Sequence, residues 1–213
     1  MFSEAVKNVL RAVSSALQIP TIVILLLLIL VTVIMLGSLL AEYLTERRLL
    51  KAKIPLLIDQ MQEKTPWELE EIIKKSGLLK RQKKAARELI IRTGLPDATR
   101  EALARQLIFE EENRYAKITR ITDLVAKIAP MFGLMGTLIP LGPGLMALGQ
   151  GDTKTLSGSL LIAFDTTVAG LISAAASYII SAIRKRWYQE YMVGLETIME
   201  TILEEQSRGD KRL

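Results

Sequence analysis

The sequence lacks both cysteine and histidine throughout its 213 residues. Without cysteine the chain has no disulfide bridges and no thiol nucleophile, and without histidine it has no imidazole for acid–base catalysis. The usual ligand sets of zinc, haem and iron–sulfur clusters are excluded for the same reason. The polar segments contain no glycine-rich phosphate loop and no nucleophile with a neighbouring base. We therefore expect a protein that is not an enzyme and that needs no metal and no cofactor.

Apolar and charged residues are both abundant. Half of the residues are hydrophobic, 24% are charged, and 28 basic against 23 acidic residues give a net charge of +5. The mean hydropathy of +0.28 is high for a soluble domain with so many charges. Apolar and charged residues must therefore be separated along the chain, which is typical of a membrane protein.

The first apolar segment is long enough to cross a bilayer. Residues 12–41 carry no charge, and Leu, Ile and Val dominate the predicted span at residues 19–41. A cleaved signal peptide is the competing interpretation. The apolar region is too long for one, and no small-residue cleavage site leads into a polar segment. We expect a retained membrane anchor.

Two further apolar segments follow in the second half of the chain: residues 128–151 carry no charge, and residues 155–183 carry one. They predict spans at residues 124–149 and 155–183, and the short polar loop at residues 150–154 joins them into a hairpin. The third span contains one charged residue, Asp165. Three spans place the two chain ends on opposite sides of the membrane.

Lysine and arginine next to the spans predict the orientation, because cytoplasmic flanks are enriched in both. One side carries four such residues after the first span, four before the second and three after the third, namely Arg47, Arg48, Lys51, Lys53, Arg114, Lys117, Arg120, Lys127, Arg184, Lys185 and Arg186. The other side carries Lys7, Arg11 and Lys154. We predict a multi-pass protein of the inner (cytoplasmic) membrane. Residues 42–123 and the C-terminal helix at residues 184–213 lie in the cytoplasm, and residues 1–18 and the hairpin loop lie outside.

The predicted cytoplasmic region is helical. Thr65, Pro66 and Glu68 form a capping-box pattern that starts a helix ending near residues 76–77. A second helix fits residues 78–92 and is stopped by the sequence 93–96, which contains a glycine and a proline. A third helix runs from Asp97 without interruption into the second span. The fold class is therefore all-α, with long helices continuous from the membrane into the cytoplasm, and the basic residues suit a solvated face or lipid headgroups better than nucleic acid.

The second span combines small residues, a hydroxyl and prolines. Gly133 and Gly136 allow a neighbouring helix to approach closely, and Thr137 offers a hydroxyl to a neighbouring helix or an ion. Pro140 and Pro143, with two glycines beside them, predict a distorted helix.

Small, weakly polar residues recur along the third span at helical spacing: Ser159, Thr166, Gly170, Ser173, Ser177 and Ser181. Such a stripe serves either tight helix packing or one wall of a polar conduit between assembled subunits. Asp165 favours the second interpretation, because a carboxylate within a span usually faces an interior and marks an ion pathway.

Two segments resemble a known family. Residues 129–137, Ala-Pro-Met-Phe-Gly-Leu-Met-Gly-Thr, are similar to the A-P-L-L-G-L-L-G-T signature of the ExbB/TolQ/MotA proton-channel superfamily. Residues 163–171, Ala-Phe-Asp-Thr-Thr-Val-Ala-Gly-Leu, are similar to its A-L-x-A-T-A-x-G-L segment. The resemblance covers residues 98–190, and the three-span layout matches the ExbB/TolQ branch.

The resemblance implies a pentameric channel and scaffold around a single-span ExbD/TolR-like partner whose transmembrane aspartate carries protons. Ion-motive force would then drive mechanical work or energised transport. Thr137 and Thr167 would line the ion path, and we add Asp165 and Thr166 as candidates. A second class of function stays open, a non-conducting scaffold of an envelope or secretion assembly.

Three departures from the family pattern indicate a divergent branch. Ile162 occupies the family's acidic position, and Asp165, three residues further on, lies on nearly the same side of the helix. Residues 174–176 replace a usual proline. The segment Pro140–Pro143 differs from the usual G-T-V-x-G-I continuation. The driving ion is therefore left open between H⁺ and Na⁺.

Overall fold

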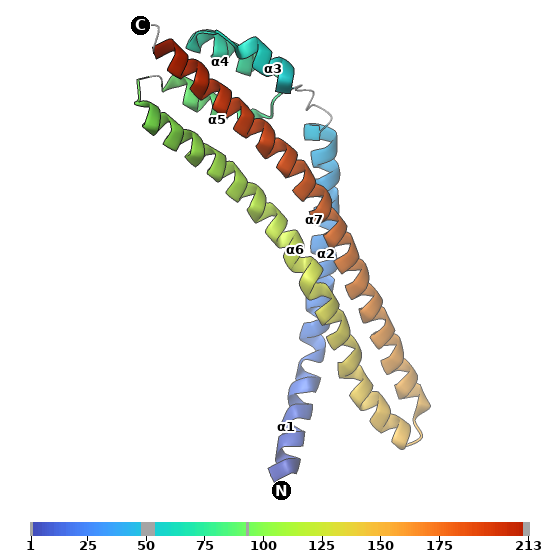
Figure 1. Ribbon diagram of the computed structural model, residues 1–213. Coiled ribbons are helices and arrows are strands. Elements are labelled where there is room, and N and C mark those ends of the chain that lie inside the picture. Colours follow the sequence, from blue (N-terminus) through green and yellow to red (C-terminus); the bar gives the residue numbers. More distant parts are fainter. Residues whose placement is uncertain (1, 48–53, 93, 211–213) are drawn as a thin grey trace. The chain divides into compact units, whose positions relative to one another are not determined.

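The computed structural model describes residues 2–47, 54–92 and 94–210, and every regular element in these ranges is helical (Figure 1). Three helices are long and apolar enough to cross a membrane, within Gln18–Thr45, Asp97–Gly149 and Thr153–Arg208. The predicted all-α class with three candidate spans is thus confirmed. Predictions for Arg48, Lys51, Lys53, Thr93 and residues 211–213 fall outside the described residues.

The chain divides into two compact units. Met1–Ser38 and Arg120–Ala182 form the first, which we call the span unit, and Leu39–Thr119 and Ile183–Leu213 form the second, which we call the extramembrane unit. The two longest helices, α6 (Asp97–Gly149) and α7 (Thr153–Asp210), contribute residues to both units. The predicted run of one helix from the polar region into the second span is confirmed.

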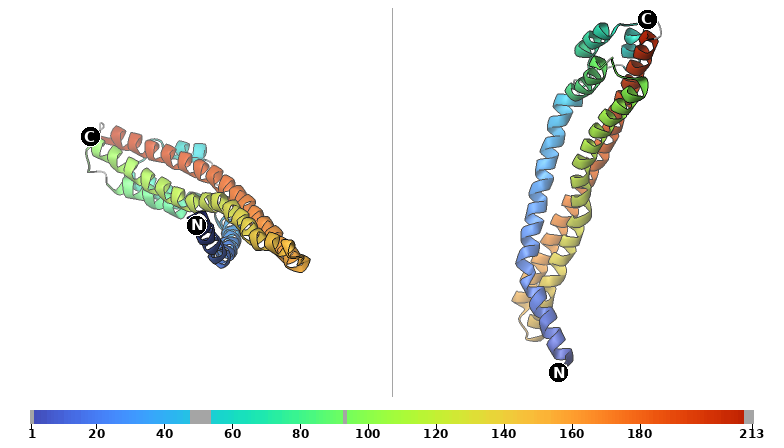
Figure 2. Two further views of the ribbon diagram at one scale, coloured as in Figure 1. Left: turned by 90° about the horizontal axis from the view of Figure 1, so that it is seen from below. Right: turned by 90° about the vertical axis from the view of Figure 1, so that its left-hand side faces the viewer.

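The span unit holds α1 (Phe2–Ala16), most of α2 (Gln18–Glu42) and the hairpin of α6 and α7. Within it, α6 and α7 run side by side in opposite directions (Figures 1 and 2). The turn between them contains Gly151 at φ +81°, a conformation that favours glycine. Asp152 then caps α7 by accepting hydrogen bonds from the Thr155 backbone N–H (3.0 Å) and hydroxyl (2.5 Å), which lower the pKa of Asp152.

The prolines do not interrupt α6. The sequence predicts a distorted helix at Pro140–Pro143, yet α6 stays α-helical through Pro130, Pro140 and Pro143 to Gly149. Pro140 and Pro143 have no N–H, so the carbonyls of Gly136 and Ile139 lack their usual donors while the helix continues on both sides. The prolines therefore do not end the span.

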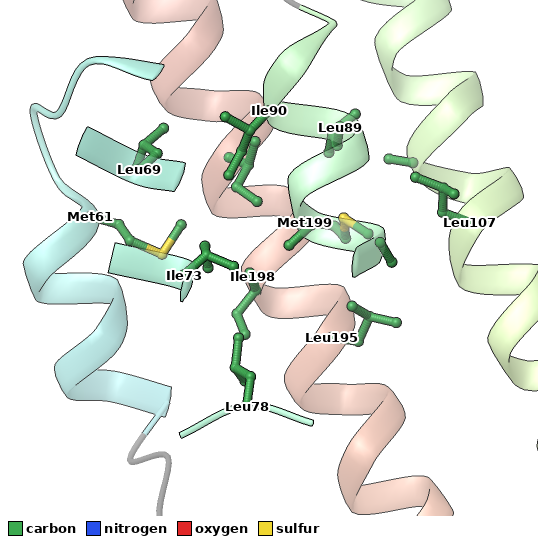
Figure 3. Packing of buried hydrophobic residues seen from close by; sticks show 14 of the residues in the cluster. Met61, Leu69, Ile73, Leu78, Leu89, Ile90, Leu107, Leu195, Ile198 and Met199 are labelled. Carbon is green, nitrogen blue, oxygen red and sulfur yellow. The ribbon is translucent and has the colours of Figure 1, made fainter. Parts of the chain in front are cut away.

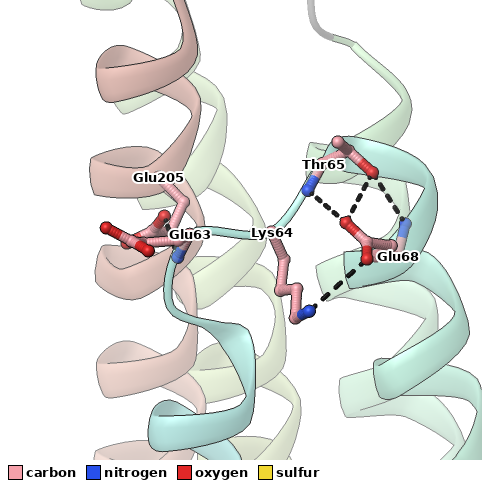
Figure 4. A network of polar contacts seen from close by, with 5 residues as sticks. All are labelled: Glu63, Lys64, Thr65, Glu68 and Glu205. Atoms are coloured by element: carbon pink, nitrogen blue, oxygen red, sulfur yellow. Dashed lines mark hydrogen bonds and ion pairs between the residues drawn. The ribbon is translucent and has the colours of Figure 1, made fainter.

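The extramembrane unit contains α3 (Ile54–Met61), α4 (Pro66–Lys75) and α5 (Lys80–Ile91), and α2 enters it through a π-helical turn at Tyr43–Arg47. The predicted capping box is confirmed (Figure 4). The Thr65 backbone N–H donates to Glu68 (2.9 Å), and the Glu68 backbone N–H donates to the Thr65 hydroxyl (3.4 Å). The bonds that Glu68 accepts from Thr65 lower its pKa.

A hydrophobic core joins five helices of this unit (Figure 3). Its buried side chains come from α3, α4, α5, α6 and α7, and include Met61, Leu69, Ile73, Leu89, Ile90, Leu107, Leu195, Ile198 and Met199. Burial of these side chains stabilises the folded unit by about 25 cal/mol for each Å² of apolar surface removed from water.

A buried polar contact, which sequence analysis did not predict, joins the end of α2 to α7. The Arg184 guanidinium and the Tyr188 hydroxyl each donate to Glu42, both at 3.2 Å. Burial and the Glu42 carboxylate raise the pKa of Tyr188. Opposite charges that directly follow two spans are the only signal in the sequence that would have suggested this pair.

Candidate ion pathway in the membrane hairpin

The two hairpin helices approach most closely at a pair of glycines. A Cβ added to Gly170 would lie 2.8 Å from the Ala129 carbonyl oxygen and 2.9 Å from the Gly133 Cα. A Cβ added to Gly133 would lie 3.2 Å from the Thr166 carbonyl oxygen. Since there is no room for a side chain, backbone packs directly on backbone, as small residues allow within membranes.

Two further contacts fix how the helices are aligned along their length. A Cβ on Gly136 would lie 2.6 Å from the Thr166 hydroxyl oxygen, and one on Gly144 would lie 2.9 Å from the Ser159 Cβ. Thr166 is buried against α6, and its hydroxyl donates to backbone carbonyls of α7 at 2.9 and 3.0 Å. Pro140 is buried on the same face of α6, whereas Pro143 is exposed.

The serine stripe of α7 is buried inside one subunit. Ser173, Ser177 and Ser181 are each 2% exposed or less. Ser177 lies 3.3 Å from the Thr32 hydroxyl of α2, and the Ser181 hydroxyl donates to Asp123 of α6 at 2.5 Å. This placement favours packing over a conduit for the three serines. Asp123 and Thr32 were not predicted as their partners, because contacts between distant segments leave no local signal in the sequence.

Thr137 and Thr167 lie on one flank of the hairpin. Gly136 faces Thr166, and the next residue on each helix is turned by about 100° in the same sense. Because the helices are antiparallel, these turns bring Thr137 and Thr167 to the same side of the pair. Both side chains are half-buried.

Each of these two hydroxyls donates to its own helix. Thr137 donates to the Leu134 carbonyl at 2.7 Å, and Thr167 donates to the Ala163 carbonyl at 3.0 Å. With the proton directed to the backbone, the oxygen lone pairs stay available to accept a hydrogen bond or to coordinate a cation. Two such oxygens on one flank can accept hydrogen bonds from water or coordinate a cation, as the polar groups that line ion paths do.

Asp165 projects from the other flank of α7. It precedes Thr166 by about 100° of helical rotation, whereas Thr167 follows Thr166 by the same angle, so the structure does not bring Asp165 together with the threonine pair. The Asp165 side chain is exposed, and its neighbours Leu161 and Val168 on the same face are also exposed. Among residues 2–47, 54–92 and 94–210, no side chain forms a hydrogen bond or ion pair with it.

The Gly170 contact gives a first prediction. Gly170→Ala places a methyl group against the Ala129 carbonyl and the Gly133 backbone, and we expect it to lower the stability of the hairpin by about 1–3 kcal/mol. Thermal unfolding in detergent, followed by circular dichroism, measures the change. Gly158→Ala is the matched control, because no atom lies within 4 Å of an added Cβ there. Equal unfolding temperatures for the two variants would contradict the close contact.

The comparison with protein families agrees with the resemblance seen in the sequence. The model of the MotA/TolQ/ExbB proton channel family matches residues 46–197, a segment that includes both hairpin motifs. No curated protein matches the chain.

Proposed function

The chain belongs to the MotA/TolQ/ExbB proton channel family, whose members are non-enzymatic channel subunits of energy-transducing complexes, and from this premise we propose that it forms the channel and scaffold of an ion-driven membrane motor. A homo-oligomer, a pentamer by the family resemblance, encloses a single-span ExbD/TolR-like partner with a transmembrane aspartate. Flow of H⁺ or Na⁺ through this complex drives mechanical work or energised transport.

The observation that carries this proposal is the pair of threonine oxygens on one flank of the hairpin. Thr137 and Thr167 come from different helices, and both direct their protons to their own backbone. A flank that presents two acceptors suits a partly dehydrated cation or a chain of water molecules next to the partner's aspartate. Replacement of both hydroxyls, with ion flux as the readout, is the direct test.

The orientation in the membrane is part of the same proposal. The excess of lysine and arginine in residues 42–123 and after residue 183 supports a cytoplasmic location for the extramembrane unit, in the inner membrane, with the N-terminus outside. The partner aspartate and the threonine flank would then lie within the bilayer.

The non-conducting scaffold is the second candidate function. The burial of Ser173, Ser177 and Ser181 within one subunit favours it, because these small residues then serve packing alone. The two candidates differ in what they require of the threonine flank, since a scaffold has no use for acceptor oxygens there.

Assembly provides a second prediction. The flank of α7 that carries Asp165 is exposed, and lipid chains do not solvate a carboxylate, so covering this flank by further subunits is favoured. We expect native mass spectrometry of the detergent-extracted protein to detect a homo-oligomer. Detection of monomers alone, with the helical content intact, would contradict the proposed ring.

A further inference from the structure

The exposed face of α5 carries a stripe of positive charge. Lys80, Lys84 and Arg87 are exposed at helical spacing on this face, and with Lys74 and Lys83 they line a groove of about 260 Å³ between α4 and α5. Ile73 and one acidic residue, Glu70, complete the groove, and the glutamate is paired with Arg87 at 2.6 Å. We call Lys80, Lys84 and Arg87 the basic stripe.

The lysines of this stripe have no ion-pair partner inside the described subunit, although Glu88, Glu110 and Glu111 line a neighbouring groove with Lys80 and Lys84. In the part of the chain that the structure describes, Lys80 and Lys84 form no ion pair. Lys80 is also the first residue of α5, whose first turn has no acidic residue, and the positive end of the helix dipole disfavours a cation there. An external anionic group would relieve this repulsion, so the stripe suits a docking surface better than a stabilising feature of the fold.

The exposed face of α7 in the same unit carries the opposite charge. Glu196, Glu200 and Glu204 are exposed and recur every fourth residue, so they lie on one face of the helix. Glu204 is paired with Arg208 at 2.6 Å. Glu196 and Glu200 have no ion-pair partner among the described residues. We call these three residues the acidic stripe.

The two stripes point in opposite directions. The face of α5 opposite to its basic stripe packs on α7, where Gln82 donates to the Tyr191 carbonyl at 2.8 Å and Gln206 donates to the Ile90 carbonyl at 3.2 Å. The face of α7 opposite to its acidic stripe supplies Leu195, Ile198, Met199 and Ile202 to the core (Figure 3). The stripes therefore cannot meet within one chain.

We propose that the basic stripe of one subunit docks on the acidic stripe of the next, so that α5 and α7 form a head-to-tail contact around the ring. This inference rests on the oligomer of the proposed function. Complementary patches on opposite sides of a subunit are what a closed cyclic assembly requires, because each copy then uses both. The groove has no aromatic residue on which a nucleotide base would stack, which disfavours a nucleotide there.

Cysteine cross-linking tests the contact directly, because the natural chain has no cysteine. In the full-length oligomer, Lys84→Cys combined with Glu200→Cys should give an oxidation-dependent ladder of covalent multimers up to the full ring. Each single variant alone should give no ladder, because a head-to-tail contact never places identical residues together. Lys84→Cys with Glu101→Cys is the control pair, since Glu101 is an exposed glutamate of α6 outside the acidic stripe.

Charge reversal provides the second arm. Glu196→Lys with Glu200→Lys should lower the cross-linking of a cysteine pair at Arg87 and Glu204 by about tenfold or more, and added Lys80→Glu with Lys84→Glu should restore it. An intact oligomer without cross-links would overturn this contact while leaving the proposed ring standing. If charge reversal of the basic stripe leaves the cross-linking between subunits unchanged but weakens the binding of a different, acidic protein, that protein occupies the stripe and the inference is wrong. Monomers alone in native mass spectrometry would instead refute the proposed function.

Discussion

Replacing Thr137 and Thr167 together by valine should abolish ion flux without dissociating the oligomer. Valine has nearly the shape of threonine but neither donates nor accepts a hydrogen bond. Each hydroxyl donates to its own helix, at Leu134 and Ala163, so its removal leaves the described contacts between helices in place. The acceptor oxygens on the shared flank disappear, however, and an ion loses its partners there.

The measurement is ion uptake into vesicles that contain the chain with its single-span partner, alongside native mass spectrometry of the same variant. We expect flux to fall by more than about tenfold, with each single variant intermediate. Thr197→Val is the matched control, because its hydroxyl makes the same bond to its own helix, to Val193 at 2.8 Å, in the extramembrane unit. Unchanged flux in the double variant would assign the pair to helix packing and favour the non-conducting scaffold.

The sequence predicts the fold well where local signals decide it. Long apolar runs with almost no charge predict all three candidate spans, because a helix surrounded by lipid must be apolar over its whole crossing. The capping box at Thr65 predicts the start of α4 at Pro66 from residues three positions apart. The predicted helix at residues 78–92 corresponds to α5 at Lys80–Ile91, and here the local signal is the glycine and proline at residues 93–96 that stop the helix. The helix α1, whose exposed Val6, Val9 and Val13 share one face, was predicted only as an outward-facing segment.

The arrangement of the site was harder to predict because it depends on how two helices pair. The sequence places Asp165, Thr166 and Thr167 next to each other, and from the sequence all three suit one pathway. Only the contact between Gly136 and Thr166 fixes which side of α7 faces α6, and this contact joins residues thirty positions apart in the chain. Helical rotation alone turns Asp165 and Thr167 about 200° apart, and the contact with α6 shows that Thr167, not Asp165, shares a flank with Thr137. Helix propensity, which counts proline as strongly unfavourable, likewise does not predict that α6 persists through Pro140 and Pro143.

Asp165 raises the question of what surrounds a carboxylate within a predicted span. Its side chain is exposed among apolar neighbours on one flank of α7 and makes no polar contact inside the described subunit. A charged carboxylate at the centre of a bilayer costs about 2.5–3.5 kcal/mol on insertion scales. This face should therefore meet another subunit, the partner span or a hydrated path, and not lipid chains.

Two substitutions at Asp165 separate these environments. Asp165→Asn keeps the size and hydrogen-bonding capacity but removes the charge, so we expect a folded oligomer whose ion flux falls by more than about tenfold. Asp165→Leu should also lose flux, and it should gain no thermal stability, because the surroundings that accept the carboxylate are polar in the assembled complex. A carboxylate facing lipid would behave differently, since leucine there relieves the cost of the buried charge. Full flux in the Asn variant, together with a higher unfolding temperature in the Leu variant, would show that Asp165 is a tolerated surface acid outside the ion path.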